Sequence, residues 1–398
     1  MRAALLALVF LALRVVLLFV RAPFFDELYT AWMARQPLGA IVPHLLHDSG
    51  PPLYYFLARI PSVDALRWMS LVFAAIAFVL VLRKSLVAAA LLAVYPPAVL
   101  YATEARGYAL CGLLVAIGVL LFDEERPYAS AAAFAGAAYA HYYGVLFFPT
   151  KNWRALLLAV ALFIPGFVLA LHQPFEAMAW NVRPQYLVLL VSVAPFIALA
   201  RTWRFAPAVL IPLALVIAFA LAGRNIYFPM RFESVLAVPL VLWAAASLER
   251  WRPALRTTII AVLMIAGGAI AVRGIAVEMQ RPTDSRVRAA MFAARFGPSA
   301  TVVAADYCYL FAASELGPRV RAFPPAQGEH PGWYAPPSME AALAAARSLP
   351  ANGFVFIGDA GTPELAALPR VRRVQLRFRD GPAVVLWVEP RDLTSTVH

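Results

Sequence analysis

Residues 4–27, ALLALVFLALRVVLLFVRAPFFDE, join a long apolar run to two adjacent carboxylates. The run over 4–20 is close to the length that a helix needs to cross a bilayer. Arg14 interrupts it and no small-x-small cleavage site precedes Arg21, so we expect an uncleaved first transmembrane helix rather than a secretory signal. Ionisable residues at the end of such a helix need an explanation, because charge is costly at membrane depth. The pair Asp26-Glu27 is therefore a candidate functional site, with a solvated loop start as the plain alternative.

The composition extends this interpretation to the whole chain. Hydrophobic residues make up 63% of the 398 residues, the mean hydropathy is +0.74, and Asp and Glu together number only 22. These values predict a polytopic α-helical membrane protein. The net charge of +12 comes from Lys and Arg in short clusters between apolar runs, which favours membrane topology and anionic lipid over nucleic acid as its cause. Cys111 and Cys308 lie in different kinds of segment and indicate no disulfide framework.

Apolar runs recur along the first 275 residues, although several are shorter than the roughly 20 residues that a span prefers. The segment 142–148 either extends the run before it, giving ten spans, or crosses by itself, giving eleven. The positive-inside rule favours about eleven spans with a cytoplasmic N-terminus. Lys151, Arg154, Arg201, Arg204, Arg250, Arg252 and Arg256 then lie inside, and Arg183, Arg224 and Arg231 lie outside. The apolar runs are 4–20, 68–82, 86–100, 108–122, 128–140, 155–171, 186–200, 205–222, 233–248 and 257–273.

This topology gives the outer face a long first loop, residues 21–66, together with everything after about residue 275. Leu28, Ala31 and Trp32 recur at helical spacing within that loop, so we expect a short helix on the membrane surface. The remaining outer segments are 101–107, 141–143, 172–185 and 223–232.

From Pro282 the composition changes to that of a soluble domain. Alternating strand and helix patterns predict a small extracytoplasmic α/β domain over 276–398, following a transmembrane domain over 1–275. The expected helices are 286–296 and 339–348, and the expected strands are 300–305, 354–357, 371–378 and 383–388, the last two antiparallel.

Polar residues gather in the predicted outer segments, far apart in sequence but on one face of the membrane. A carboxylate at such a site can take a proton from an attacking hydroxyl, and arginines bind phosphate bidentately and stabilise the charge on a departing phosphate. Acids and arginines at a membrane interface therefore suggest group transfer from a lipid-phosphate donor, although a transporter cavity could hold the same residues. The candidates are Asp26 and Glu27; His44, His47, Asp48, Tyr54 and Tyr55; Tyr101, Glu104, Arg106 and Tyr108; Arg224, Tyr227, Arg231 and Glu233; and His141.

Four motifs in these segments carry a resemblance to a known group. They are Phe25-Asp26-Glu27 after the first span, Pro51-Pro52-Leu53-Tyr54-Tyr55, Glu104-Ala105-Arg106-Gly107-Tyr108, and Arg231-Phe232 followed by Pro239. In their order and shared sidedness they resemble the GT-C glycosyltransferases, in the branch of protein O-mannosyltransferases and lipid A aminoarabinose transferases. The resemblance covers roughly residues 1–275, and the tail is similar to those of bacterial members. It implies Asp26 as catalytic base or acceptor-orienting carboxylate, with Arg106 and Arg231 binding the lipid phosphate.

The resemblance implies a multi-pass glycosyltransferase of the bacterial inner membrane, with its active site and C-terminus on the periplasmic side. It would move a sugar from a polyprenyl-phosphate-linked donor to a lipid, glycan or protein acceptor, with inversion, among membrane lipids and without nucleic acid. We expect no cofactor and no resident metal, although His44, His47 and Asp48 leave a divalent ion open. The expected roles are catalysis for Asp26, Glu27 and Asp48; donor binding for Arg106, Arg231, Arg224, Glu104 and Tyr108; and pocket lining for His47, His141, Tyr54 and Tyr55.

Structural explanations compete with several of these assignments. Glu27 could stabilise a helix start, Glu104 could pair with Arg106, and Arg224 and Arg231 could anchor lipid headgroups. The tyrosines are more typical of an interfacial aromatic belt than of ligand-binding residues, and Arg14 has no assigned role. For the whole protein, a transporter or flippase is the alternative from another class, and a non-catalytic anchor for the α/β tail is a second.

Overall fold

The computed structural model of the chain describes residues 2–148, 151–174, 186–224, 226–305, 307–329, 331, 337–368 and 371–389. Arg183 and most of the predicted outer loop 172–185 lie outside the described residues. The chain divides into two compact units. The first consists of Met1–Arg21 and Met33–Arg281, and the second of Ala22–Trp32 and Pro282–His398.

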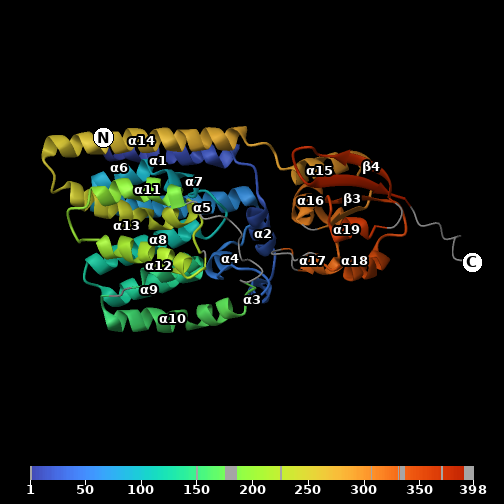
Figure 1. Cartoon of the computed structure of the whole chain (residues 1–398), viewed down its shortest axis with the longest axis horizontal. Helices are drawn as coiled ribbons and strands as arrows, with labels where there is room; N and C mark the ends of the chain where they lie inside the picture. Colours follow the sequence, from blue (N-terminus) through green and yellow to red (C-terminus); the bar gives the residue numbers. More distant parts are fainter. Residues whose placement is uncertain are drawn as a thin grey trace, which may run out of the picture. The chain divides into compact units, whose positions relative to one another are not determined.

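The first unit is a bundle of apolar helices that run side by side (Figure 1). Among the described residues, five helices are long and apolar enough to cross a membrane, namely α1 (Arg2–Val20), α5 (Val63–Lys84), α10 (Trp153–Leu171), α13 (Arg231–Leu248) and the helix that begins with α14 (Pro253–Gln280). The protein is therefore a multi-pass membrane protein, as predicted. Shorter elements complete the bundle: α3 (Leu38–Leu45), α4 (Leu53–Leu57), α6 (Leu86–Val94), α7 (Pro96–Leu100), α8 (Tyr108–Asp123), α9 (Pro127–Ala140), η1 (Tyr142–Phe147), α11 (Tyr186–Ala198) and α12 (Ala206–Leu221).

Helix α13 occupies the centre of the bundle, where it packs against α6, α8, α11 and α12. Of its most apolar stretch, 83% is buried, against 11% for the helix that begins with α14. The residue that begins α13 is Arg231, so the most buried helix of the unit carries one of the predicted phosphate ligands at its N-terminus.

The apolar run predicted over 86–100 forms two helices, and the buried Arg14 stabilises the break between them. Pro96 and Pro97 have no N–H groups, so they cannot donate to the carbonyls of Leu92 and Ala93 four residues earlier. The Arg14 guanidinium donates instead, with Nη1 3.0 Å from the Ala93 oxygen and Nη2 3.2 Å from that of Leu92. It also bonds to the carbonyls of Phe10 and Ala98. An unpaired backbone group is not tolerated in a bilayer core, so Arg14 makes the broken helix possible.

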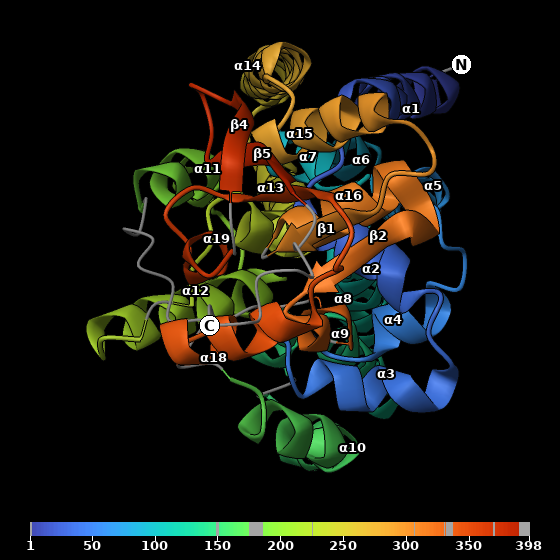
Figure 2. The ribbon, with the colours of Figure 1, turned by 90° about the vertical axis from the view of Figure 1, so that its right-hand side faces the viewer.

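The second unit is a three-layer α/β structure (Figure 2). Its sheet has the strand order β2-β1-β3-β5-β4. Strand β1 (Val302–Ala305) is parallel to β2 (Val320–Phe323) and to β3 (Phe354–Asp359). Strand β5 (Ala383–Val388) is antiparallel to β3 and to β4 (Val371–Arg377). Helices α15 (Ser285–Ala293) and α16 (Cys308–Leu316) cover one face, while α18 (Met339–Ala345) and α19 (Pro363–Ala366) cover the other. Helix α17 (Pro325–Glu329) follows β2, and α2 (Phe25–Met33), apart from its last residue, also belongs to this unit.

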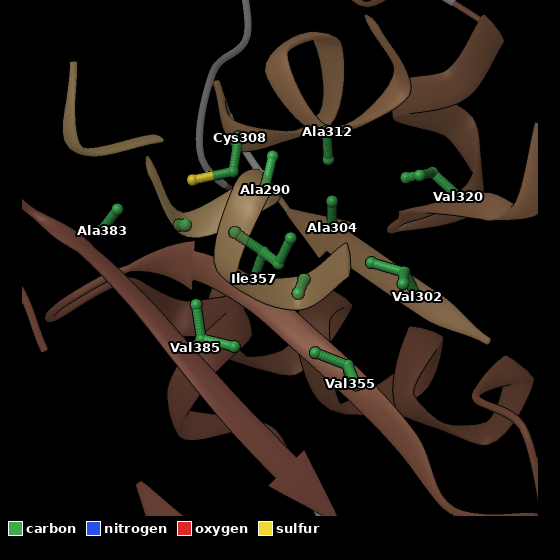
Figure 3. Close-up of a cluster of buried hydrophobic side chains, with 12 residues drawn as sticks. Ala290, Val302, Ala304, Cys308, Ala312, Val320, Val355, Ile357, Ala383 and Val385 are labelled. Carbon is green, nitrogen blue, oxygen red and sulfur yellow. The ribbon is translucent and has the colours of Figure 1, made fainter. Parts of the chain in front are cut away.

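Residues alternate between the two faces of the sheet, as strand geometry requires. Along β1, Val302 and Ala304 join the core under α15 and α16 (Figure 3), whereas Val303 and Ala305 join the core on the opposite face. A strand covered on both faces reads as a continuous apolar run, which is why the strand pattern in the tail was recognisable. The predicted α/β tail is confirmed; β2 and α16 were not predicted, because both are short and flanked by polar residues.

We predict that Arg14→Met lowers the thermal unfolding midpoint of the purified protein. The substitution keeps an unbranched, flexible side chain but leaves the Leu92 and Ala93 carbonyls without a donor, at about 1–3 kcal/mol for each unpaired buried group. A thermal-shift measurement in detergent, with the exposed Arg2→Met as control, tests this. Equal midpoints for the two variants would contradict the role assigned to Arg14.

Candidate functional site

Two arginines, a histidine and two tyrosines from separate segments meet at one end of the bundle. The Arg231 guanidinium carbon lies 5.6 Å from the centre of the Tyr108 ring, and the guanidinium lies close to the Tyr101 hydroxyl. Tyr101 packs edge-on against Tyr108, with ring centres 5.5 Å apart. The centre of the His141 ring lies 4.8 Å from that of Tyr108. Arg106 is close enough to affect the titration of His141. Loop 101–107, the end of α9 and the start of α13 thus contribute to one polar cluster.

Arg106 connects this cluster to a carboxylate. Its Nη1 donates to the Tyr55 hydroxyl at 2.6 Å, and that hydroxyl in turn lies 3.5 Å from Oδ2 of Asp48. Asp48 and Tyr55 are both buried. One hydroxyl that accepts from the guanidinium and donates to the carboxylate restricts the orientation of Arg106, so its planar fork is prearranged for an oxyanion.

The loop that carries Arg106 is held by a buried ion pair. Arg21, at the end of α1, lies 3.4 Å from Oε1 of Glu104 and 3.6 Å from Oε2 of Glu278 on α14. Arg67 Nη1 also donates to the Arg21 carbonyl at 2.7 Å, which adds α5 to the arrangement. Glu104 therefore has a structural partner in Arg21, where the sequence suggested Arg106 for that role. Its contribution to the site is to hold the loop two residues before Arg106.

Gly107 allows this loop to approach α9 closely. A Cβ atom at this position would collide with the carbonyl oxygen of Ala140, the residue before His141. The absence of a side chain at Gly107 therefore brings the start of α8 against the end of α9. This contact brings Arg106 and Tyr108 beside His141.

The surroundings of His141 disfavour the charged form of its imidazole. Its burial, and then the positive charges of Arg106 and Arg231, lower the pKa of the imidazole from 6.5 to about 3. The Nδ1 atom accepts a hydrogen bond from the backbone N–H of Tyr143 at 3.2 Å, which fixes the ring between Tyr108 and Tyr143. The positive charge of the cluster therefore comes from its arginines, and His141 shapes the wall between them.

Three polar residues that the sequence did not single out, Tyr143, Tyr142 and Gln173, hold the segments that surround the cluster. The Tyr143 hydroxyl donates to the Ile226 carbonyl at 2.9 Å and accepts from the Phe228 N–H at 3.1 Å, so η1 fixes the segment before Arg231. The Gln173 amide donates to the carbonyls of Leu45 and Gly50, at 2.8 and 2.9 Å, on either side of Asp48. Tyr142 donates to Gln173 at 2.7 Å. The only sequence signal was the position of these residues beside His141 and in the outer loop after α10.

Not every candidate belongs to the cluster. The Tyr54 hydroxyl lies 2.9 Å from Ser70 Oγ, which ties α4 to α5 and gives Tyr54 a structural role. Arg224 and His47 have exposed side chains. Tyr227 donates to Glu233 at 2.7 Å, beneath the segment that leads to Arg231. No group of three or more His, Cys, Asp and Glu side chains that could hold a metal ion occurs in the described ranges.

Asp26 and Glu27 lie in the first turn of α2, in the second unit. A helix N-terminus favours carboxylates, so stabilisation of the helix remains an alternative role for Glu27. Beside them, Phe25 packs edge-on against Tyr307, with ring centres 4.6 Å apart and an interplanar angle of 86°. The Arg286 guanidinium carbon lies over the Tyr307 ring, 5.5 Å from its centre, and Arg286 Nη2 lies 2.6 Å from Oδ2 of Asp359. The start of α2 is thus packed on a rigid part of the α/β unit.

No protein-family model and no curated protein sequence matches the chain. Comparison of structures, however, finds the crystal structure of ArnT from Cupriavidus metallidurans in the apo state, with a TM-score of 0.61 and 14% sequence identity over 98% of this chain and 99% of that one. The structure of the same ArnT bound to undecaprenyl phosphate matches with a TM-score of 0.58 and 12% identity over 98% of both chains. This chain has the ArnT fold. ArnT is a lipid A aminoarabinose transferase of the GT-C superfamily, so the resemblance seen in the sequence motifs is confirmed at the level of the fold.

Proposed function

We propose that this protein is a membrane glycosyltransferase that takes a sugar from a polyprenyl-phosphate-linked donor. The convergence of Arg106 and Arg231 on one cluster, beside a neutral His141, is the observation that carries the proposal. Two guanidinium groups without a protonated histidine suit a single lipid-linked phosphate, which they bind through charge-assisted hydrogen bonds. The ArnT fold supports the same function, since one ArnT structure holds undecaprenyl phosphate.

In the proposed reaction, an acceptor hydroxyl attacks the anomeric carbon of the donor sugar. The new bond to the acceptor oxygen forms as the bond to the phosphate oxygen breaks, which inverts the anomeric centre. The acceptor proton passes to Asp26, and the electron pair of the broken bond leaves with the polyprenyl phosphate. Arg106 and Arg231 stabilise the charge that develops on this phosphate. Asp48, through Tyr55, orients Arg106, and Glu27 is the second carboxylate on α2 available for acceptor binding.

Chain connectivity supports the participation of Asp26. Only four residues lie between it and Arg21, which limits the distance between their Cα atoms to about 18 Å. Arg21 in turn is paired with Glu104, two residues before Arg106. In the sequence, Asp26 thus follows Arg21 and Arg106 follows Glu104, and Arg21 and Glu104 form one ion pair.

A transporter or flippase remains the alternative from another class, and it requires charged groups along a route through the bilayer midplane. The buried Arg14 guanidinium bonds to four carbonyl oxygens, which favours a structural role. The other candidates in the first unit gather at one end of the bundle. This distribution favours an enzyme that works at one membrane surface.

We further propose eleven crossings, with the cluster and the α/β unit on the periplasmic side of a bacterial inner membrane. His141 contacts Tyr108 at the start of α8, whereas Leu146 and Phe148 line a cavity with Asp123 at its end. Segment 142–148 therefore runs back from the start of α8 toward its end, and we propose it as a crossing without an α-helix. Non-helical backbone is tolerated at membrane depth where protein surrounds it, and η1 packs against α8, α9, α12 and α13.

Asp26→Asn should lower the rate of sugar transfer by about 10²–10⁴-fold, because the amide keeps the shape of the side chain but cannot accept the proton. Transfer from a polyprenyl-phosphate sugar by the purified variant measures the effect. Asp64→Asn, an exposed acid in the first turn of α5, is the matched control. Turnover of the Asp26 variant at the wild-type rate would refute its assignment as the base.

Arg106→Ala and Arg231→Ala should each weaken donor binding about 10- to 100-fold, the loss expected when a charge-assisted hydrogen bond is removed. Lysine at either position should restore binding only in part, because it lacks the planar fork. Binding of a polyprenyl-phosphate analogue is the measurement, with the exposed Arg126→Ala as control. Unchanged affinity in both alanine variants would make these residues structural.

Tyr307→Ala should lower kcat on the order of 10- to 100-fold with little change in the KM for the donor, because it removes the ring on which Phe25 packs and so displaces the neighbouring Asp26. Tyr307→Phe keeps the ring and should retain activity. Steady-state kinetics of the two variants separates orientation from binding. An equal kcat for alanine and phenylalanine would show that this packing has no part in catalysis.

A reporter fused after His398 should indicate a periplasmic C-terminus, since eleven crossings and a cytoplasmic N-terminus carry the chain end across. Alkaline phosphatase should be active in this fusion, and green fluorescent protein should be dark. The reverse pattern would mean an even number of crossings and would contradict the proposed sidedness.

A further inference from the structure

A second cavity lies at the opposite end of α8 from Arg106 and Tyr108. Its volume is about 310 Å³, and it lies between the end of α8, helix α9, η1 and the start of α12. Phe122, Phe134, Phe147, Phe205 and Ile211 give it a mainly apolar wall. A cavity of this volume with few polar groups is typical of a site for an apolar or amphipathic ligand.

One side of this cavity is charged, and its balance is positive. Asp123 accepts from Arg204 through both Nε and Nη2 at 2.8 Å, and Lys84 Nζ lies 2.8 Å from its Oδ2. Lys151 and Glu125 also line the cavity. The lining itself has two cations and two carboxylates, and Lys84, which contacts Asp123 from outside the lining, brings the local balance to one positive charge. In the described part of the chain no acidic side chain pairs with Lys151. An anionic group at this side would therefore find a cation that is not yet neutralised.

Exposed tryptophans accompany these cations. Trp203, next to Arg204, is 77% exposed, and Trp153, two residues after Lys151, is 64% exposed. Exposed tryptophan beside basic residues is typical of the level at which lipid headgroups meet the hydrocarbon region. The charged side of the cavity is thus suited to a headgroup and the aromatic wall to the chain below it.

We infer that this cavity is a binding site for an anionic phospholipid, with one acyl chain against the aromatic wall and the phosphate at Lys151 and Arg204. The site is separate from the proposed donor site, because α8, with 16 residues and a length of about 24 Å, lies between them. The charge balance selects an anionic headgroup over a zwitterionic one. The inference does not depend on the proposed function.

The bound lipid stabilises η1. Leu146, Phe147 and Phe148 form part of the cavity wall, and Tyr143, three residues earlier, bonds to Ile226 and Phe228. A lipid packed against η1 therefore supports the segment that leads to Arg231.

Native mass spectrometry of the full-length protein with dioleoylphosphatidylglycerol or dioleoylphosphatidylcholine tests the inference. The wild type should retain one phosphatidylglycerol in preference to phosphatidylcholine and should gain thermal stability from it. Lys151→Glu should weaken this binding about tenfold or more, whereas Arg83→Glu, the same charge change at an exposed position outside the cavity lining, should not. Equal losses in both variants would mean general attraction to an acidic membrane and would overturn the site.

A second pair of variants tests the position of the acyl chain without changing charge. Ala208→Trp would fill the cavity and should abolish the selective retention, while Ala214→Trp on the exposed face of α12 should leave it intact. Undiminished phosphatidylglycerol retention by a folded Ala208→Trp protein would contradict the inference. Equal retention of the two phospholipids by the wild type would contradict it as well.

Discussion

Every backbone polar group in a bilayer core needs a hydrogen-bond partner, and the bundle depends on this constraint. Arg14 supplies such partners where an apolar helix is broken. Pro96 and Pro97 interrupt an apolar run and leave the carbonyls of Leu92 and Ala93 without their usual donors. A guanidinium has five donors in one plane, so a single arginine on α1 can serve both carbonyls and two more besides. The charge at membrane depth is therefore accounted for by structure, and the broken helix leads directly into the loop that carries Arg106.

At the end of the bundle that carries Arg106, a buried ion pair joins separate segments. Arg21 joins α1 to loop 101–107 through Glu104 and to α14 through Glu278, in a setting where both side chains are largely removed from solvent. Breaking such a pair from one side is expensive, because the remaining charge is left buried. The ion pair and the space permitted by Gly107 together hold Arg106 beside Tyr108 and His141. Arg231 reaches the same cluster from α13, the most buried helix, so the two arginines of the proposed site rest on rigid supports.

The sequence predicted those features that depend on local pattern. Apolar runs revealed the helices, and continuous apolar strands such as Phe354–Asp359 revealed the sheet of the α/β unit. It also predicted that Arg106, Tyr108, His141 and Arg231 lie on one face of the membrane. The structure brings these four residues together at one end of the bundle. The role of Arg14 was not predictable, because it depends on carbonyls almost eighty residues away. Tyr143 and Gln173 were missed for a similar reason, since neutral side chains in apolar surroundings give no signal until their backbone partners are known. The packing of Phe25 on Tyr307 likewise joins residues that no periodicity relates.

The central claim is that Arg106 and Arg231 together bind a lipid-linked phosphate. A cryo-electron microscopy structure of the protein in lipid nanodiscs with undecaprenyl phosphate tests it most directly. Phosphate oxygens should lie within about 2.7–3.2 Å of both guanidinium groups, beside Tyr108 and His141, with the chain of the lipid leaving toward the membrane. A polyprenyl phosphate bound at the Lys84–Arg204 end of the bundle, or held without either Arg106 or Arg231, would contradict it.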